Sequence, residues 1–258
     1  MDNLPDIASR SGVNRIRAVL ASGASVDTRD KDGRAALFRT ARLGKADCVR
    51  LLLESGGDPN TTDSNGEAPL QAAARYGHLE CVDLLIKHGT QIDYCPDPKL
   101  TEYSESALCS AVRKGHEHVV ECLFRAGASP NASTCSGRLP LLEAAGKGDV
   151  SMCRRLVEMG ACINQGDKHR ATALHYAVRS QSVETVRSLL EMGAKVDETD
   201  DEGMTPVLEA ISTILDNSVP LLFALLKAKP DLSIRSKRLG YTPLEQAVEF
   251  EMDEVQTY

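Results

Sequence analysis

The sequence has no excess of positive charge, which is the usual mark of a nucleic-acid-binding domain. Its 258 residues include 30 lysines and arginines against 37 aspartates and glutamates, a formal net charge of −7. DNA or RNA is therefore not expected as the main partner, although a local basic patch is compatible with this charge. Hydrophobic residues make up 42% of the chain and charged residues 26%, so we expect a folded core and not a disordered chain.

Signals for secretion or membrane insertion are also lacking. The first residues, Met1 to Asp6, contain no basic segment and no apolar run of the kind found in signal peptides. The longest apolar stretch, near 219–226, is interrupted by Pro220 and is far shorter than the roughly 20 residues of a membrane-spanning helix. We expect a cytoplasmic protein, with the nucleus as a second compatible location, and no membrane insertion.

The eight cysteines lack the spacing of a metal site or of a disulfide framework, and no Cys-x2-Cys pair is present. Cys48 and Cys81 stand 33 residues apart, in equivalent positions of the repeat described below. Stacked helices lie about 8–10 Å apart, and a disulfide spans at most about 7 Å between Cα atoms. We interpret the cysteines as small apolar core residues, with Cys95 and Cys135 as exposed thiols in loops.

No catalytic constellation can be assembled from the remaining residues. A Ser/His/Asp arrangement, a glycine-rich phosphate loop and a paired carboxylate site are all missing from the sequence. The glycines recur at a fixed period and mark turns. We expect neither enzyme activity within the chain nor a cofactor.

Two short patterns recur at a constant separation through most of the chain. The first ends in an apolar residue, here called the register residue, at Leu4, Leu37, Leu70, Leu108, Leu141, Leu174, Val207 and Leu244. Successive separations are 33, 33, 38, 33, 33, 33 and 37 residues. The second pattern, Gly-x-x-x-Asp/Asn, begins 19 residues after the register residue in six copies. A unit of about 33 residues therefore repeats along the sequence.

Each unit has the features of two helices joined by tight turns. An alanine-rich run follows the register residue, as in 70–76, and ends at a glycine such as Gly77. A second run has apolar residues at helical spacing, as in Val49, Leu52 and Leu53, and ends at the glycine of the second pattern. One helix pair cannot bury its apolar face alone, so neighbouring pairs must stack into a continuous core.

This pattern resembles the ankyrin repeat, which has a period of 33 residues and the motif Thr-Pro-Leu-His. The nearest copy is 172–175, and 205–206 and 242–244 match in part. The resemblance covers essentially the whole chain. It implies an all-α solenoid of about eight helix pairs with short β-hairpin turns, in a single domain over 1–258. The expected units are 1–30, 31–63, 64–98, 99–134, 135–167, 168–200, 201–236 and an incomplete 237–258.

The motif threonine and histidine tie the turn to the helix by hydrogen bonds in the family. The first four units mostly lack both residues and are expected to be somewhat less rigid. His175 is the motif histidine, while His78 and His116 each follow a glycine that ends a helix. We interpret all three histidines as structural.

Two insertions and the C-terminus depart from the regular period. Five extra residues lie within 94–104, where they either project at the edge of a binding surface or form a neutral loop insertion. Four extra residues after Val207 are interpreted as neutral. The last unit stops a few residues into its second helix, so the chain is either a fragment of a longer protein or ends in a short helix. Leu225 and Leu226 are expected to be poorly covered, at the least stable end.

The ankyrin resemblance also implies where a partner binds. In the family, hairpin tips and the ends of the first helices line a concave groove, and the residue five positions after the register residue faces it. Arginine occupies this position in four units, at Arg42, Arg75, Arg113 and Arg179. Nearby candidates are Arg34, Tyr76, Tyr103, Lys114, Arg138, Lys147 and His169. The alternative is that arginine is a common choice here because its stem packs along the helix.

We therefore predict a protein-interaction module, a monomer acting as a scaffold or adaptor, that binds a protein or peptide segment. A cationic groove would favour an acidic segment or a C-terminal carboxylate. The alternative is a regulatory or substrate-recruiting segment of a larger protein whose catalytic or effector domain lies beyond Tyr258.

Three asparagines, Asn60, Asn131 and Asn164, occupy the hairpin position that an asparaginyl hydroxylase modifies in the ankyrin family. Each follows a leucine by eight residues, the spacing which that enzyme favours. The resemblance therefore implies that they are modification sites. The alternative interpretation is that these residues only form turns.

Overall fold

The computed structural model is built of short helices joined by loops, and it describes residues 3–97, 99–100, 105–132, 137–213 and 218–249. The first helices of the pairs are α1 (Leu4–Arg10), α3 (Ala36–Arg42), α5 (Pro69–Arg75), α7 (Ala107–Lys114), α9 (Pro140–Gly146), α11 (Ala173–Arg179), α13 (Pro206–Ser212) and α15 (Pro243–Glu249). The second helices are α2 (Val13–Ala21), α4 (Ala46–Glu54), α6 (Leu79–Lys87), α8 (Glu117–Arg125), α10 (Val150–Glu158), α12 (Val183–Glu191) and α14 (Ser218–Lys227). The predicted all-α solenoid of helix pairs is confirmed.

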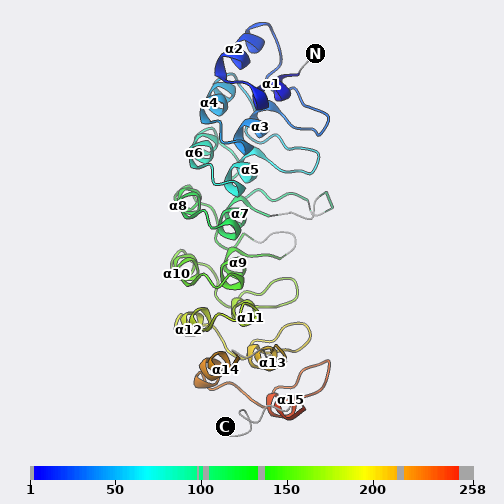
Figure 1. Cartoon of the computed structure of the whole chain (residues 1–258), viewed down its shortest axis with the longest axis vertical. Coiled ribbons are helices and arrows are strands. Elements are labelled where there is room, and N and C mark those ends of the chain that lie inside the picture. Colours follow the sequence, from blue (N-terminus) through cyan, green and yellow to red (C-terminus); the bar gives the residue numbers. More distant parts are fainter. Residues whose placement is uncertain (1–2, 98, 101–104, 133–136, 214–217, 250–258) are drawn as a thin grey trace. The chain divides into compact units, whose positions relative to one another are not determined.

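The chain divides into two compact units, an N-terminal unit of residues 1–136 and a C-terminal unit of residues 137–258. In the N-terminal unit, α1, α3, α5 and α7 each contact the next in one layer, and α2, α4, α6 and α8 form a second layer. In the C-terminal unit the layers are α9, α11, α13 and α15, and α10, α12 and α14 (Figure 1). The predicted single domain over 1–258 stays a prediction.

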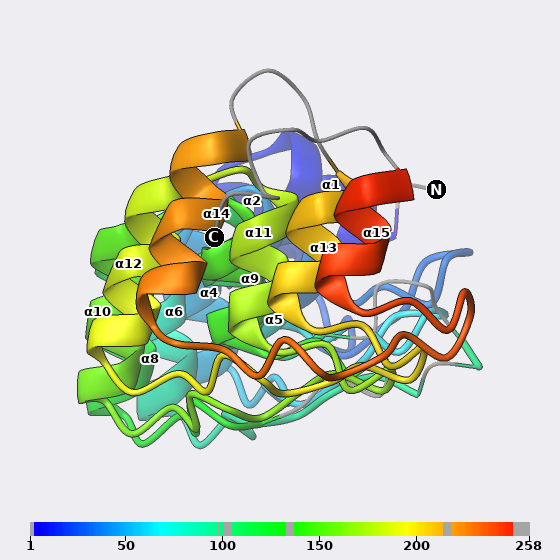
Figure 2. The same ribbon diagram turned by 90° about the horizontal axis from the view of Figure 1, so that it is seen from below.

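Loops connect each second helix to the first helix of the next pair. Within each unit, the described parts of these loops pass the helix ends and project beyond the layer of first helices (Figure 2). No helix in the described part of the chain is long and apolar enough to cross a lipid bilayer.

The register residues form the core contacts of the first helices. Seven of them are only 1–2% exposed, from Leu4 to Val207. Fully buried alanines such as Ala41, Ala73 and Ala177 let the neighbouring first helices approach closely. Leu244, the last register residue, is 53% exposed. The register deduced from the sequence therefore identifies the core of every described pair except the last.

The expectation that Leu225 would be poorly covered is wrong. Leu225 has no exposed surface, and Leu226 is half-buried. Helix α14 packs against both α12 and α13, which cover this face. Among the described residues of this end, the exposed large apolar side chains are instead Val219, Phe223, Leu232, Leu239, Leu244 and Val248.

The predicted hairpin turns are closed by backbone hydrogen bonds, such as Asp63 N–H to the Glu67 carbonyl at 2.9 Å, together with the side chain of an aspartate. In the described residues, the isolated bridge is the one between Arg29 and Ala35. In the turn before α5, Asp63 Oδ1 accepts the backbone N–H groups of Asn65 and Glu67, each at 2.9 Å. Equivalent bonds are made by Asp30, Asp167 and Asp200. Such side-chain bonds satisfy backbone donors that a sheet would otherwise pair.

His78 and His116 lock neighbouring helix pairs together, as their structural interpretation requires. His78 Nε2 lies 3.1 Å from the Arg42 carbonyl oxygen, and His116 Nε2 lies 3.1 Å from the Arg75 carbonyl oxygen. The His78 ring packs so closely on Gly44, at φ +69°, that an added Cβ would lie 2.5 Å from it. Glycine is required here for its left-handed conformation and for its small size.

His175 ties the turn to helix α11 as the motif implies. Its Nδ1 accepts the Thr172 backbone N–H at 3.1 Å, so Nε2 carries the proton and donates to the Met204 carbonyl at 3.0 Å. In the N-terminal unit, Gln71 ties a turn to its helix in the same way. Its side chain accepts a hydrogen bond from the Ala68 backbone N–H and donates one to the Tyr94 carbonyl. The lower rigidity of the units without the motif histidine stays a prediction.

Burial, the main influence on His175, disfavours the imidazolium and lowers its pKa from 6.5. A lowered pKa contributes stability above about pH 6.5 that is lost as the pH falls through the folded-state pKa. The substitution His175→Gln retains a donor and an acceptor but cannot titrate. We expect this variant to be less stable than the native protein by about 1 kcal/mol at pH 7, with the gap narrowing toward about pH 5.

Urea unfolding followed by circular dichroism between these pH values measures the gap. His169→Gln is the matched control, because that side chain is 65% exposed. A gap for His175→Gln that stays constant with pH would contradict the prediction.

Candidate partner-binding surfaces

The four arginines predicted to face the groove lie in the last turn of their first helices. Arg42, Arg75 and Arg113 belong to α3, α5 and α7 of the N-terminal unit, and Arg179 belongs to α11 of the C-terminal unit. Their charged groups meet very different surroundings, which the sequence pattern alone does not distinguish.

Arg75 and Arg113 belong to a half-buried network of ion pairs with two glutamates. Arg75 Nη2 lies 3.0 Å from Glu67 Oε1 and 3.6 Å from Glu105 Oε1. Arg113 donates to both oxygens of Glu105, at 3.0 and 2.5 Å. The side chain of Glu105 is 5% exposed and those of the arginines are 18% and 22% exposed. These guanidinium groups are therefore already engaged by carboxylates of their own chain.

The pKa values of the two glutamates of this network are shifted in opposite directions. Burial disfavours ionisation of Glu105, but the hydrogen bonds from Arg113 and the positive charges of Arg113 and Arg75 prevail and lower its pKa. Burial dominates at Glu67 and raises its pKa despite the charge of Arg75. Glu105 is the carboxylate that both arginines of the network contact.

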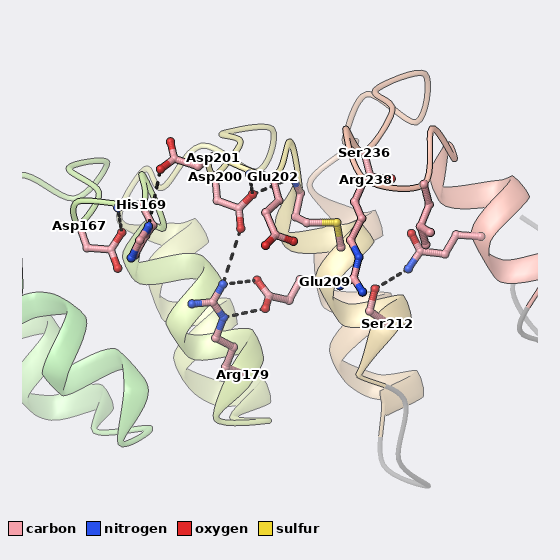
Figure 3. A pocket seen from close by; sticks show the side chains of 13 residues that line it. Asp167, His169, Arg179, Asp200, Asp201, Glu202, Glu209, Ser212, Ser236 and Arg238 are labelled. Carbon is pink, nitrogen blue, oxygen red and sulfur yellow. Dashed lines mark hydrogen bonds and ion pairs between the residues drawn. The ribbon is translucent and has the colours of Figure 1, made fainter.

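Arg179 is also engaged within its own chain. It donates to both oxygens of Glu209, at 2.6 and 3.1 Å, and lies 3.7 Å from Asp200 (Figure 3). Its guanidinium carbon stands 5.5 Å from the centre of the Tyr176 ring. Glu209 comes from α13, the first helix of the next pair, so this ion pair also joins two repeats.

Arg42 differs because its own turn carries no matching acid. Glu67 and Glu105 each stand eight residues before an arginine, whereas Arg34 occupies that position before Arg42. Arg42 is exposed, and its guanidinium carbon lies 5.6 Å from the centre of the Tyr76 ring. Its Nη2 donates to the Tyr76 hydroxyl at 3.4 Å.

A cavity of about 430 Å³ adjoins this pair, and we call it the Arg42 site. It is lined by Ser9, Arg34, Arg39, Arg42, Leu43, Tyr76 and His78. Arg34 contacts Asp32 at 2.9 Å, and Arg39 pairs with Asp30 and Asp6, but none of these carboxylates lines the cavity. The Tyr76 ring, 47% exposed, stacks on His78 with 6.2 Å between centroids. The site presents positive charge beside an aromatic face.

The remaining predicted site residues are dispersed. Arg138 is exposed and contacts Glu143 at 3.1 Å, and Lys114 and Lys147 are exposed at the ends of α7 and α9. His169 lies in the loop before α11, 3.7 Å from Asp201. Tyr103 falls outside the described residues, as do parts of the 94–104 insert.

The described part of that insert is attached to the neighbouring turn. The Tyr94 hydroxyl donates to the Gly66 carbonyl at 3.0 Å, and Leu100 is 55% exposed.

The asparagines considered for modification bridge adjacent repeats. Asn60 Oδ1 accepts the Gln91 backbone N–H, and Asn164 Oδ1 accepts the Lys195 backbone N–H, both at 2.8 Å. Asn131 is half-buried in the equivalent turn. These bonds give Asn60 and Asn164 a structural role whether or not they are modified.

A second cavity, of about 440 Å³, lies between α11, α13 and α15 and the loops that precede them (Figure 3). We call it the acidic cavity, because five carboxylates and two guanidinium groups line it. Sequence analysis missed it because its acids lie at several different positions of the repeat.

Four cysteines are buried as predicted, Cys48, Cys81, Cys109 and Cys153. Burial raises the pKa of Cys81 to about 11 and that of Cys153 to about 12, which makes these thiols poor nucleophiles. Cys95 is half-buried, Cys135 lies outside the described residues, and the exposed thiol of Cys162 was not predicted. No group of three or more metal-binding side chains occurs in the described part of the chain.

The ion-pair network yields a stability prediction. Glu105→Gln leaves Arg75 and Arg113 half-buried without their shared carboxylate, so we expect the free energy of unfolding to fall by about 1–3 kcal/mol at neutral pH. A lowered carboxyl pKa contributes stability above about pH 4.5 that is lost as the pH falls through the folded value. The difference in free energy of unfolding between the variant and the native protein should therefore become smaller at acidic pH.

Urea unfolding from neutral to acidic pH measures this gap. Glu80→Gln is the control, because its ion pair with Arg50 is exposed and should contribute at most about 1 kcal/mol. Equal losses for the two variants would show that the network does not stabilise the fold.

Comparison with known proteins agrees with this architecture. Part of an L-asparaginase of Dirofilaria immitis is 32% identical over 109 residues, which are 42% of this chain and 18% of that protein. The chain thus spans less than a fifth of the length of this relative. The crystal structure of the human ASB11 ankyrin repeat domain matches with a TM-score of 0.75 and 23% identity, covering 88% of this chain and 98% of that one.

The family model for ankyrin repeats, in three copies, matches residues 6–95, 55–134 and 108–200. These overlapping matches together span residues 6–200, well over half of the sequence. The chain therefore belongs to the ankyrin-repeat family.

Proposed function

We propose that this chain binds a segment of a partner protein along its loops and first helices, as a scaffold or adaptor. Ankyrin-repeat domains generally mediate protein–protein interaction, because stacked repeats present an extended surface. We further propose that the protein is a monomer and that it acts in the cytoplasm or the nucleus.

The Arg42 site is the observation that supports this proposal best. A carboxylate entering its cavity meets the exposed guanidinium of Arg42 beside the face of Tyr76. Arginine and tyrosine are the residues that most often dominate interface energy. Charge-assisted hydrogen bonds contribute about 1.5–3 kcal/mol when partly desolvated, so an acidic side chain or a C-terminal carboxylate fits this site.

The other groove arginines support an acidic partner less strongly. An incoming carboxylate would have to compete with Glu105 for Arg75 and Arg113, and with Glu209 for Arg179. Those three arginines hold their repeats together. The proposed acid-binding role therefore rests on Arg42 and Tyr76, with Arg34 and Arg39 as nearby charges.

A second candidate function is a regulatory or substrate-recruiting segment within a larger protein. The similarity to 18% of a longer L-asparaginase favours this alternative, because there a related repeat segment occurs in a chain with a further part. The binding surface would be the same in both cases.

We also propose hydroxylation of Asn60, Asn131 and Asn164. Asn60 and Asn164 use their side-chain amides in turns, so an enzyme would need to open these turns first. Mass spectrometry of peptides from cells would show one added oxygen atom on each modified asparagine, and unmodified asparagine throughout would contradict the proposal.

The binding proposal predicts that the double substitution Arg42→Ala and Tyr76→Ala weakens partner binding about tenfold or more. The ligands are peptides selected by the native chain from a displayed random library. We expect acidic residues or a free C-terminal carboxylate among them, and affinity that falls with added salt. Fluorescence anisotropy on the full chain measures the dissociation constants.

Arg50→Ala is the control, because it removes an exposed arginine from a second helix and should leave affinity nearly unchanged. If binding survives the double substitution but is lost on Leu100→Ala, the 94–104 insert is the binding site.

A further inference from the structure

The acidic cavity of the C-terminal unit has the opposite charge to the Arg42 site. Its carboxylates are Asp167, Asp200, Asp201, Glu202 and Glu209, and its guanidinium groups are Arg179 and Arg238 (Figure 3). With His169 neutral, the lining carries a formal excess of three negative charges. Its volume of about 440 Å³ lies within the range of ligand sites. A cavity of this charge attracts cations and disfavours carboxylates.

Three of the five carboxylates are occupied by their own chain. Asp167 accepts two backbone N–H groups and the Tyr176 hydroxyl. Asp200 accepts two backbone N–H groups of its turn, and Glu209 holds Arg179. The Arg179 charge is in turn balanced by Glu209 and, at 3.7 Å, by Asp200, which weakens its attraction for an anion.

Asp201 and Glu202 are the carboxylates that remain accessible. Both are exposed residues in the loop before α13, at the rim of the cavity. The Asp201 carboxylate lies 3.7 Å from the His169 ring, and the Lys237 ammonium donates to the backbone carbonyl of Asp201 at 3.1 Å. Within the described part of the chain, no lysine or arginine forms an ion pair with the carboxylate of Asp201 or Glu202, so both carboxylates can accept a further donor.

Two buried polar atoms in the cavity wall lack hydrogen-bond partners, which is a second and independent observation. Ser236 is 3% exposed and Gln246 is 1% exposed, and Ser236 Oγ and Gln246 Oε1 are both unpaired. The Gln246 amide is fixed because Nε2 donates to the Leu208 carbonyl and to Ser212 Oγ. Its Oε1 can only accept, so the group that would satisfy it is a donor.

Lysine and arginine side chains meet all of these requirements. Both are cationic, and their charged groups carry only hydrogen-bond donors. Arg238 already places one guanidinium group at this cavity. The cavity lining is still negatively charged when the charge of Arg238 is included.

We infer that the acidic cavity is a subsite for a lysine or arginine side chain of the partner segment, held by Asp201 and Glu202 at the rim. This inference rests on the proposed function, since it takes the ligand of the cavity to be a side chain of the partner protein. The partner would then carry an acidic group that binds at the Arg42 site and a basic residue that binds in the acidic cavity.

The test titrates isotope-labelled full-length chain with N-acetyl-arginine amide and N-acetyl-lysine amide, followed by nuclear magnetic resonance. N-acetyl-citrulline amide, a neutral analogue of the arginine probe, is the ligand control. We expect saturable shifts of the signals of Asp201, Glu202 and the Gln246 side-chain amide with the two cationic probes. Citrulline should bind about tenfold more weakly or not at all, and added salt should weaken the cations.

The matched variants separate local contact from the general field of the protein. Asp201→Asn with Glu202→Gln should weaken cation binding at least about fivefold. Glu184→Gln with Glu191→Gln removes the same charge from exposed positions of α12, outside the cavity, and should have little effect. All four changed side chains are exposed, and thermal unfolding verifies that the variants fold.

Equal binding of citrulline and arginine, or equal losses in the two double variants, would overturn the inference. So would shifts confined to residues outside the cavity. The proposed function is judged separately, by the selected peptides and the Arg42 and Tyr76 substitutions. Selected peptides that need Arg42 but ignore Asp201 and Glu202 would therefore reject the cationic subsite and leave the proposed function standing.

Discussion

The close approach of neighbouring first helices determines most of the local chemistry within each unit. Fully buried alanines at these contacts bring equivalent helix ends near enough for their side chains to meet. Arg75 reaches Glu105, Arg179 reaches Glu209, and Arg42 reaches Tyr76, each in the following repeat. Because these partners come from the next repeat, the surface chemistry of one repeat depends in part on the residues of its neighbour.

The sequence predicted the helices and most of the core because both follow from a local period. Apolar spacing, helix-ending glycines and the register residues each lie within one repeat, and seven register residues are buried as expected. The ion pairs between repeats, Arg75 with Glu105 and Arg179 with Glu209, were missed because they join residues 30 positions apart. A signal for the pairs within a repeat was present, since Glu67 stands eight residues before Arg75 and Glu105 eight residues before Arg113. Leu225 was misjudged because the cover that α12 and α13 give it is not visible in a linear pattern.

The pairing pattern also explains why recurrence of a residue type does not by itself indicate a binding role. Arg42, Arg75, Arg113 and Arg179 share one position of the repeat. A half-buried arginine with two carboxylate contacts holds the fold together, since separating the pair would leave uncompensated charge in a region of low polarity. Arg42 has a tyrosine face instead, and a contact of that kind leaves its donors available. An acid in the turn, as at Glu67, or on the next first helix, as at Glu209, engages the helix-end arginine, and Arg34 takes the place of such an acid before Arg42.

The charges that a ligand meets at the surface depend more on nearby ion pairs than on the net charge of −7. In water at physiological salt, charges more than about 8 Å apart are largely screened from one another, so a ligand responds to the groups lining its own cavity. The Arg42 site is cationic within an acidic protein, because the carboxylates near it lie outside the cavity. The acidic cavity keeps Asp201 and Glu202 accessible because Arg179 and the backbone have already taken up its other acids. In each unit, the charged side chains that can bind a partner are those that the ion pairs of the chain itself have not neutralised.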